Sequence, residues 1–367
     1  MGGEWPYNAA IRFRFTTLRR NPARHRTVRH RLTRRQHDYT DLAFDCQLRR
    51  PGRGEPRAQA MLKHLPSRTA VALFWLLHFL PLPILAYLGE SLGTLLYQFG
   101  VRRRKIVLVN LSLCFPELNE QQRRTLARAH FRMLGRSILE RAILWWGSRD
   151  RLSKMIRVDG EEKIRAARDA GRPVILLAPH FVGLDIGGIG IALRFDVVSI
   201  YSAQENPVFD QLLLHGRRRF GDQQLLTRQD GARASIKAMK SGRPFYYLPD
   251  MDFGRRDSVF APFFGVEAAT ITGRSRLARA AGATVIPCVT RMLPGGQGYV
   301  VEVGEPWADF PTDDVEADTR RMNTFIEGVV RTMPEQYYWV HRRFKTRPQG
   351  EKRPYERSPQ SRRRTKP

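Results

Sequence analysis

The chain has 367 residues, of which 42% are hydrophobic, so it is long enough to build one large domain or two small ones around a sizeable core. Its three cysteines, Cys46, Cys114 and Cys288, are too few and too widely spaced for a disulfide framework or a cysteine metal site, which favours a reducing compartment. Cys288 lies in an apolar, strand-like run, so we interpret it as a core residue rather than a nucleophile.

The formal net charge of +28 is extreme, and most of it lies at the two ends of the chain. Residues 1–60 hold 14 Arg, no Lys and five acidic residues, whereas residues 342–367 hold 11 basic and two acidic residues. Such tails are typical of disorder combined with contact to an anionic partner, either nucleic acid or a membrane. We predict a disordered basic tail at 351–367.

Residues 1–60 also lack any sustained apolar periodicity. We interpret them as a disordered Arg-rich extension. Our hypothesis is that the start site has been placed too far upstream, and the alternative is a genuine basic arm. Residue 1 is not followed by the apolar stretch of a secretory signal.

A long hydrophobic segment follows at residues 61–100. Its stretch from Thr69 to Leu88 carries no formal charge over twenty residues, a length that can cross a bilayer, although Pro81 and Pro83 would kink or break a helix there. Basic residues flank both sides, so they do not indicate an orientation. We predict an N-terminal membrane anchor helix that spans or dips into the bilayer, with a buried core helix as the alternative.

A long helix is predicted next. Asn119 and Gln122 have the spacing of a capping box, and apolar residues then recur at helical intervals to about Trp146. Glu140 falls within this helix, where a solvated face is its default position.

From residue 171 onward, strand-like and helix-like stretches alternate, which predicts an α/β fold with a central sheet flanked by helices. The expected strands are 174–178, 197–201, 245–248, 284–289 and 299–303. The expected helices are 184–193, 208–220, 232–240, 273–281 and 315–332. We place the catalytic domain at 101–350.

The most informative stretch runs from Gly171 to Asp185. The apolar run 174–178 predicts a buried strand that Pro179 ends, so His180 follows a strand terminus, where open α/β sheets bind their ligands. Asp185 falls in the first turn of the next helix. The two side chains can meet only if the residues between them form a turn, which Gly183 permits. This pattern predicts a general base held by a carboxylate.

Further candidate residues follow in later blocks. Asn206 precedes a helix that ends in the arginines 217–219, Asp250 and Asp252 follow a strand, and Arg343 lies in a basic run. Strand-end acids and arginines suit chemistry on a large anionic substrate, because guanidinium groups bind phosphate in bidentate fashion. The alternatives are a solvated helix face for the arginines and turn caps for the two acids. The cluster Phe260, Phe263 and Phe264 favours core over an acyl pocket. The ligand spacing does not favour a metal, and we expect no cofactor.

Several blocks together carry a family resemblance. They are Asn110-Leu-Ser-Leu-Cys-Phe-Pro-Glu117, the His180/Asp185 motif, Glu205-Asn-Pro207, Pro249-Asp-Met-Asp-Phe-Gly254, Arg256-Asp-Ser-Val-Phe260 and Trp339-Val-His-Arg-Arg-Phe-Lys-Thr-Arg-Pro348. Over about residues 61–350 the chain resembles the bacterial lipid A biosynthesis acyltransferases, the late lauroyl/myristoyl transferases of the lysophospholipid acyltransferase-like group. The resemblance implies a mixed central sheet flanked by helices.

The resemblance also implies an activity. The enzyme would move a fatty acyl chain from an acyl carrier protein thioester to a hydroxyl of a Kdo-bearing lipid A precursor, at the inner membrane with the catalytic domain facing the cytoplasm. His180 would be the base and Asp185 its orienting partner. Substrate contacts are expected from Arg217, Asp250, Asp252, Asn206 and Arg343. One departure is Tyr201-Ser202, where relatives often carry Tyr-Arg before the Asn-Pro block, and it bears on the acceptor contacts of that loop.

Two other functions remain as alternatives. A glycerolipid acyltransferase shares the His-x4-Asp motif, but usually carries a Phe-Pro-Glu-Gly-Thr-type block where this chain has Leu248-Pro-Asp-Met-Asp252. A nucleic-acid-binding protein would suit the charge, but that charge sits in the tails and no recognition motif is evident. We therefore expect no nucleic-acid partner.

Overall fold

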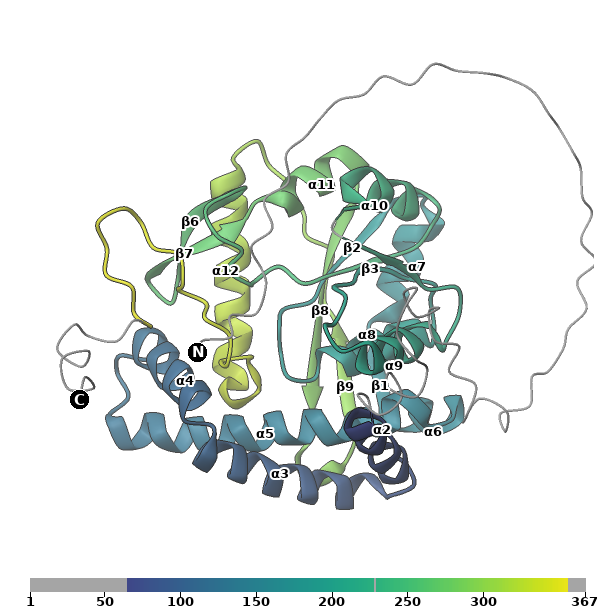
Figure 1. Cartoon of the computed structure of the whole chain (residues 1–367). Coiled ribbons are helices and arrows are strands. Elements are labelled where there is room, and N and C mark those ends of the chain that lie inside the picture. Colours follow the sequence, from purple (N-terminus) through teal and green to yellow (C-terminus); the bar gives the residue numbers. More distant parts are fainter. Residues whose placement is uncertain (1–64, 228, 356–367) are drawn as a thin grey trace, which may run out of the picture. The chain divides into compact units, whose positions relative to one another are not determined.

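The computed structural model describes residues 65–227 and 229–355, in which helices surround one large mixed sheet (Figure 1). The α/β fold with a mixed central sheet and flanking helices is confirmed. The predicted extension at 1–60 and most of the predicted tail, residues 356–367, lie outside the described residues.

The sheet has seven strands, and a separate hairpin supplies two more. The large sheet comprises β1 (Ile156–Asp159), β2 (Val174–Leu177), β3 (Val198–Ile200), β4 (Gln224–Leu226), β5 (Phe245–Tyr247), β8 (Thr284–Met292) and β9 (Tyr299–Val303), and the hairpin is β6 (Ser258–Phe263) and β7 (Val266–Ile271).

Helices connect these strands and precede them. They are α2 (Leu65–Leu77), α3 (Leu82–Phe99), α4 (Val101–Cys114), α5 (Glu120–Trp146), α6 (Arg149–Met155), α7 (Glu161–Asp169), α8 (Leu184–Ala192), α9 (Pro207–Arg218), α10 (Gly231–Lys240), α11 (Gly273–Ala281) and α12 (Val315–Thr332), with short 3₁₀ turns at Pro294–Gly296 and Pro334–Gln336.

The order of strands places β2 at the centre of the sheet, β1-β9-β8-β2-β5-β3-β4. Neighbouring strands are parallel except for β8 and β9, which pair antiparallel. All four residues of β2 are buried, as expected for a strand with neighbours on both sides and helices over both faces. Cys288 is buried in β8, which agrees with its interpretation as a core residue, and burial raises the pKa of its thiol to about 12.

The register between β2 and β5 brings two loops together. Leu177 pairs with Tyr247, and the backbone N–H of Ala178 donates to the Tyr247 carbonyl at 2.9 Å. Both strands are parallel, so their carboxyl ends lie at the same edge. His180 and Asp250 each come three residues after that matched pair, and the loops that hold them therefore run side by side.

The predicted hydrophobic segment forms two helices rather than one. α2 ends at Leu77 and α3 starts at Leu82, with Pro81 at the N-cap of α3. None of the helices described is both long and apolar enough to cross a membrane, so the predicted anchor helix is not confirmed.

α3 packs along α5 through glycines. A Cβ on Gly89 would lie 2.5 Å from the Cα of Arg136, and one on Gly135 would lie 2.1 Å from the carbonyl oxygen of Gly89. The backbones thus approach more closely than any side chain would allow, as in small-residue helix contacts. α3 is held against the rest of the molecule along this face.

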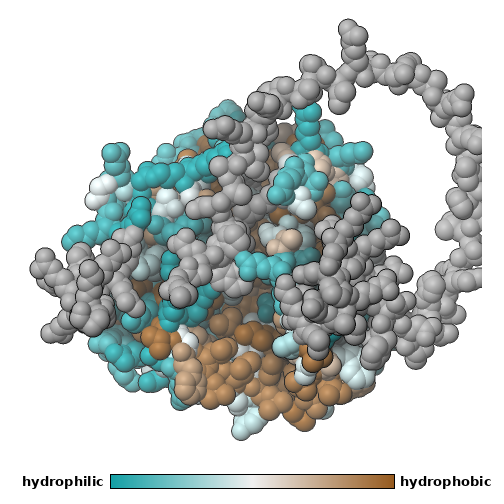
Figure 2. Space-filling view, in the orientation of Figure 1, coloured by the Kyte–Doolittle hydropathy of each residue, from teal (hydrophilic) through white to brown (hydrophobic). Residues whose placement is uncertain are grey.

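The opposite faces of α2 and α3 are apolar and exposed. Of the twelve large hydrophobic side chains exposed in the described residues, eleven lie between Leu65 and Val101, including Leu73, Phe79, Tyr87 and Phe99. Figure 2 shows the hydrophobic surface gathered at one end, over α2 and α3. We call this surface the apolar face.

The capping box of α5 is confirmed, since Asn119 accepts from the Gln122 N–H and the Gln122 side chain accepts from Asn119 N–H. The expectation that Glu140 lies on a solvated face is wrong. Its side chain is fully buried, 2.7 Å from the Arg136 guanidinium, and it accepts a hydrogen bond from Tyr299 at 2.8 Å. A charge can be buried here because both oxygens have partners.

Candidate active site

His180 pairs with Asp250 at the carboxyl edge of the sheet. Its Nδ1 lies 2.7 Å from a carboxylate oxygen of Asp250, and its backbone N–H donates to both oxygens at 3.1 Å. The Asp250 side chain is fully buried, whereas that of His180 is 14% exposed. The ring is thereby fixed by a buried carboxylate while one edge remains open to solvent.

The charge of Asp250 determines the tautomer of His180. Burial alone would raise the pKa of Asp250, but the charge of His180 and hydrogen bonds from His180 and Tyr337 outweigh burial and lower this pKa to about 2. An ionised carboxylate can only accept hydrogen bonds, so Nδ1 carries the hydrogen. In the neutral ring, Nε2 then holds the lone pair that can accept a proton.

The segment from Gln336 to His341 closes over this pair. Tyr337 hydrogen-bonds to Asp250, and its neighbour Tyr338 donates its backbone N–H to the His180 carbonyl at 2.9 Å. His341 is partly buried nearby, where its Nε2 accepts from the Asp252 N–H at 3.1 Å. Burial first, then the charges of His180 and Arg343, lower the pKa of His341 to about 3, so it is neutral at ordinary pH.

Asp185, the predicted partner of His180, pairs instead with two arginines. Arg141 of α5 lies 2.9 Å from one oxygen of Asp185 and Arg217 of α9 lies 3.5 Å from the other. Burial opposes the charge of Asp185, but the two guanidinium groups outweigh it and lower its pKa. The three side chains are 21–30% exposed, so they form a partly open cluster with one excess positive charge.

A narrow, mostly apolar pocket adjoins this cluster. Asp185 and Arg217 line it, together with apolar side chains from α5, α8, β3 and α9, among them Trp145, Leu184, Ile200 and Leu213. Gly216 allows Trp145 to reach this wall, because a Cβ on Gly216 would lie 2.2 Å from its indole ring. The pocket therefore combines a mostly apolar lining with the charged groups of this cluster.

Asp252 and Arg343, both predicted to contact substrate, are instead hydrogen-bonded in the attachment of the C-terminal segment. The Asp252 carboxylate accepts from the backbone N–H and hydroxyl of Thr346 at 2.6 and 2.8 Å, and from the Gly254 N–H at 2.9 Å, as in a turn cap. Arg343 is buried and donates to the Ala269 carbonyl and the Thr270 hydroxyl at 2.9 and 2.7 Å. Their hydrogen bonds point to a structural role.

Asn206 caps α9. Its side-chain oxygen accepts from the Val208 N–H at 3.0 Å, and its amide donates to the hydroxyl of Ser67 in α2 at 2.8 Å. These two hydrogen bonds position the helix that carries Arg217. Of the aromatic cluster, Phe263 and Phe264 are buried in the core, which agrees with the favoured interpretation.

Three residues of the site were not singled out from the sequence. Arg141 comes from a long helix that contains several other arginines, and Tyr337 and His341 come from a stretch that carries no strand or helix pattern. The block 339–348 pointed to this stretch only through the family resemblance. No cluster of three or more His, Cys, Asp or Glu side chains suited to a metal ion occurs within residues 65–227 and 229–355.

A histidine with an open Nε2, an arginine-rich cluster and an apolar pocket are together typical of an enzyme that handles a lipid-like substrate. Residues 59–346 match the family described as bacterial lipid A biosynthesis acyltransferase, so the chain belongs to that family. It is an acyltransferase of lipid A biosynthesis.

Individual relatives agree with this assignment. The chain is 40% identical to the lipid A biosynthesis lauroyltransferase of Escherichia coli strain K12, over 76% of this chain and 91% of the relative. It is 33% identical to the palmitoleoyltransferase of the same organism, over 77% and 91%, and 34% identical to its myristoyltransferase, over 75% and 84%. The solved 1-acyl-sn-glycerophosphate acyltransferase of Thermotoga maritima covers 67% of this chain and 96% of its own, at 15% identity and a TM-score of 0.32.

Proposed function

We propose that this enzyme transfers a fatty acyl chain from an acyl carrier protein thioester to a hydroxyl of a Kdo-bearing lipid A precursor, with His180 as general base. The observation that carries the proposal is the 2.7 Å contact between His180 Nδ1 and the ionised Asp250, which leaves Nε2 as the proton acceptor. A secondary hydroxyl is a poor nucleophile at neutral pH, and a positioned base typically accelerates such a step by about 10²–10⁴-fold.

The proposed step needs no nucleophile from the protein. Nε2 takes the proton of the acceptor hydroxyl while its oxygen attacks the thioester carbonyl. The tetrahedral intermediate then collapses, the carbon–sulfur bond breaks, and the proton on Nε2 passes to the departing thiolate. Asp250 stabilises the imidazolium that forms in between, and Tyr337 holds Asp250 in place.

Arg141 and Arg217 are proposed to bind an anionic part of the acceptor. In the described structure Asp185 balances one of their two charges, so the cluster retains one excess positive charge. A lipid A precursor carries phosphates and acidic sugars, and guanidinium groups bind both well. In this proposal Asp185 positions the two arginines. The sequence motif instead implies that Asp185 orients His180.

The apolar pocket between α5, α8, α9 and β3 is proposed to hold the acyl chain. Its lining is mostly apolar, and Asp185 and Arg217 are its charged lining residues. Each Å² of acyl-chain surface that such a pocket removes from water stabilises the bound chain by about 25 cal/mol. The pocket is open beside Gly188, because a Cβ there would meet only Tyr246, at 3.8 Å.

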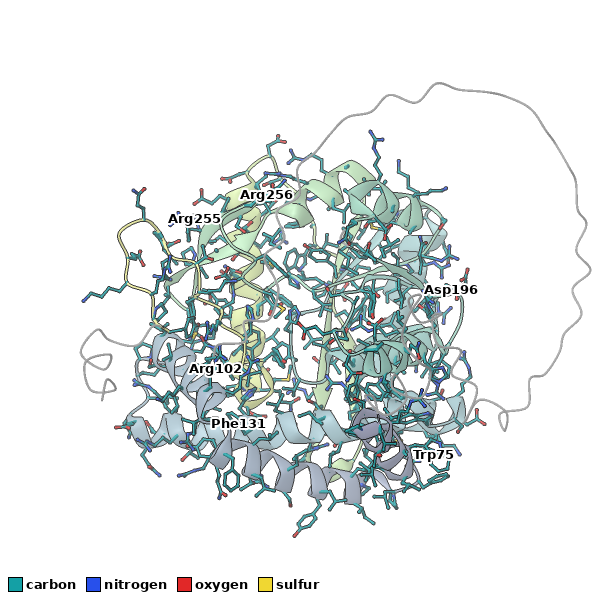
Figure 3. The ribbon with its side chains drawn as sticks, viewed as in Figure 1. Trp75, Arg102, Phe131, Asp196, Arg255 and Arg256 are labelled. Atoms are coloured by element: carbon teal, nitrogen blue, oxygen red, sulfur yellow. The ribbon has the colours of Figure 1, made fainter. Side chains whose placement is uncertain are left out.

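The apolar face of α2 and α3 is proposed to lie in the cytoplasmic leaflet of the inner membrane. Its large side chains point away from α5, and Trp75 extends from α2 on this side (Figure 3). Arg102 and Arg103, at the start of α4, are exposed beside it and could pair with anionic headgroups. This arrangement would bring the site close to a lipid acceptor.

The test is mass spectrometry of lipid A from cells that lack their own late acyltransferases. Expression of this chain should add one fatty acyl group, and the His180→Ala variant at equal abundance should add none. A matched control is His215→Ala, since His215 is an exposed histidine of α9 that the proposed step does not use. Acylation by a folded His180→Ala enzyme would contradict the proposed mechanism.

A further inference from the structure

One face of α10 is basic and makes no contact with an acid in the described part of the chain. Arg233, Lys237 and Lys240 are exposed and occur at intervals of four and three residues, so they share one side of the helix. The helix sequence contains no acidic residue. Other exposed cations nearby are paired, as Arg276 is with Asp257.

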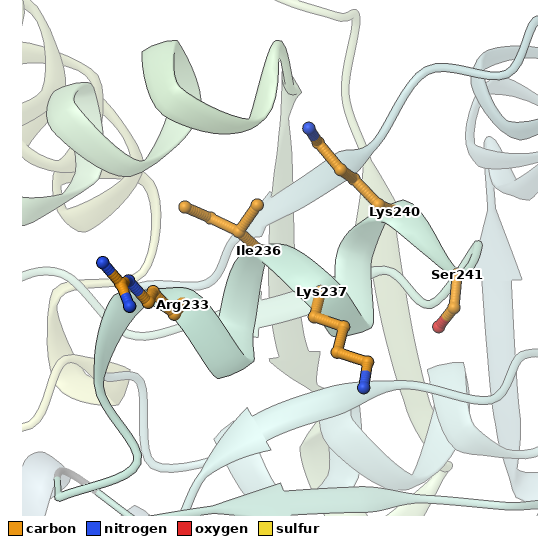
Figure 4. Close-up of a pocket in the computed structure, with 5 residues that line it drawn as sticks. All are labelled: Arg233, Ile236, Lys237, Lys240 and Ser241. Carbon is orange, nitrogen blue, oxygen red and sulfur yellow. The ribbon is translucent and has the colours of Figure 1, made fainter. Parts of the chain in front are cut away.

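This face also has an apolar centre. Ile236 is partly exposed and lies between the basic side chains, with which it lines a shallow surface pocket (Figure 4). Basic residues around a small apolar contact are the arrangement that binds an acidic amphipathic helix, since the charges steer the partner and the apolar contact holds it.

The position of α10 relates it to the site. β4 is parallel to β3 and β5, so the loop that starts α10 leaves the same edge of the sheet as the loops of His180 and Asp250. Arg233 is close to that edge, and Lys240 lies about 10 Å farther along the helix at 1.5 Å per residue. A carrier bound here would therefore dock next to the catalytic edge.

We infer that the basic face of α10 is the docking surface for an acidic carrier protein that delivers the acyl thioester. The inference rests on the proposed function, in which the donor is bound to such a carrier. Charge complementarity selects an acidic partner. α10 lies at the end of the described structure opposite the apolar face of α2 and α3 (Figure 1), so a membrane against that face would leave α10 open to a soluble protein.

The experiment compares two donors that share one acyl chain, a carrier-bound thioester and the corresponding pantetheine thioester without protein. In the variant with Arg233→Glu, Lys237→Glu and Lys240→Glu, kcat/KM for the carrier-bound donor should fall by at least about tenfold, and kcat/KM for the pantetheine donor should stay unchanged. Added salt should slow the wild-type enzyme with the carrier-bound donor but affect the variant much less.

A control with the same change in charge uses exposed cations away from α10, with Lys154, Arg157 and Lys352 replaced by Glu. It should leave both donors unaffected. Equal use of the carrier-bound donor by the α10 variant and the wild type would overturn the docking surface while leaving the proposed function intact. Loss of binding to anionic vesicles, with an unchanged rate from the carrier, would also overturn it and assign the face to lipid headgroups. A wild-type enzyme that uses neither donor would instead refute the proposed function.

Discussion

The carboxylates of Asp250 and Asp185 differ in what surrounds them, and this difference gives them separate roles in the proposed mechanism. Asp250 is fully buried and contacts the imidazole, whereas Asp185 is partly exposed between two guanidinium groups. A carboxylate that fixes a tautomer acts on the rate of the chemical step. A carboxylate that positions cations acts on substrate binding.

Replacing Asp250 by Asn should therefore lower kcat far more than the same change at Asp185. Asn at 250 can donate to Nδ1 and stabilise the wrong tautomer, and a comparable change in a serine protease triad costs about 10⁴-fold. The Asp185→Asn enzyme should instead show a raised KM for the acceptor. Steady-state kinetics of both variants, with folding checked by circular dichroism, distinguish them. A larger loss of kcat at Asp185 would assign the orienting role to it, as the sequence motif implies.

Removal of either arginine of the cluster should weaken binding of the acceptor. Arg217→Ala and Arg141→Ala should each raise the KM for the acceptor and spare kcat, because a clamp acts equally in the ground and transition states. Arg217→Lys retains the charge without the bidentate fork and should show an intermediate KM. A fall in kcat of about 10²–10³ with little change in KM would make Arg217 an oxyanion donor instead.

At the scale of secondary-structure elements, the close packing of α3 against α5 depends on glycine. Gly135→Ala would place a Cβ 2.1 Å from the Gly89 carbonyl oxygen, so the helices must separate. We expect a loss of about 1–3 kcal/mol in the free energy of unfolding. The matched control is Gly328→Ala in α12, where nothing lies within 4 Å of the added Cβ and the higher helix propensity of Ala should stabilise the protein. Chemical denaturation of both variants measures the difference, and equal stabilities would show that the crossing can adapt.

The apolar face of α2 and α3 gives a second prediction at this scale. Trp75→Glu with Phe79→Glu should reduce binding to vesicles, because both side chains are exposed and large. Phe209→Glu, which changes an exposed aromatic residue on α9, is the control and should bind normally. Co-sedimentation with vesicles at low and high salt tests this, since salt screens electrostatic attachment but leaves apolar contact in place. Complete release of the wild type by salt would assign membrane binding to basic residues instead.

Many elements were predictable because their patterns are local. The buried strand at 174–177 and the helix that follows Asn119 have an apolar run and a capping box that act within a few residues. The strands at 156–159 and 224–226 are only four and three residues long and leave too short a pattern to identify. The hairpin of β6 and β7 turns at Phe264 and Gly265, both with positive φ, and a Phe in that conformation gives no turn signal.

The candidate site was predictable only in part, because its contacts span the sequence. Spacing suggested Asp185 as the partner of His180, since it lies five residues away. Asp250 lies 70 residues away and reaches the imidazole through the register of β2 and β5. Glu140 also depended on distant residues, because Tyr299 supplies one of its hydrogen bonds. Such contacts follow from tertiary structure and not from local pattern.

At the scale of the whole molecule, two histidines whose pKa is lowered in the folded protein should make stability depend on pH. Burial lowers the pKa of His130 to about 4 and that of His341 to about 3, whereas an unfolded histidine titrates near 6.5. Between about pH 6 and pH 4 the unfolded chain binds two protons that the folded chain does not. Each histidine should therefore lower the free energy of unfolding by about 1.4 kcal/mol per pH unit as the pH falls.

Denaturation at several pH values, with His130→Gln and His341→Gln as single variants, measures these contributions. Each substitution should remove about one proton's contribution, about 1.4 kcal/mol per pH unit, from the slope of the free energy of unfolding against pH. An unchanged slope in both variants would mean that these imidazoles are protonated in the folded protein.

The segment from Gln336 to His341, which covers the His180–Asp250 pair, affects the order in which parts of the site form during synthesis. Phe181 forms a bridge with Tyr337, and Asn110 donates to the carbonyls of Trp339 and His341 at 2.7 Å each, so residues from early, middle and late synthesis meet at one place. A ribosome that has made the strand of His180 must still add more than 150 residues before Tyr337 can support Asp250. In the proposed function, α2 and α3 can therefore meet the membrane long before the proposed base, His180, gains the support of Tyr337 through Asp250.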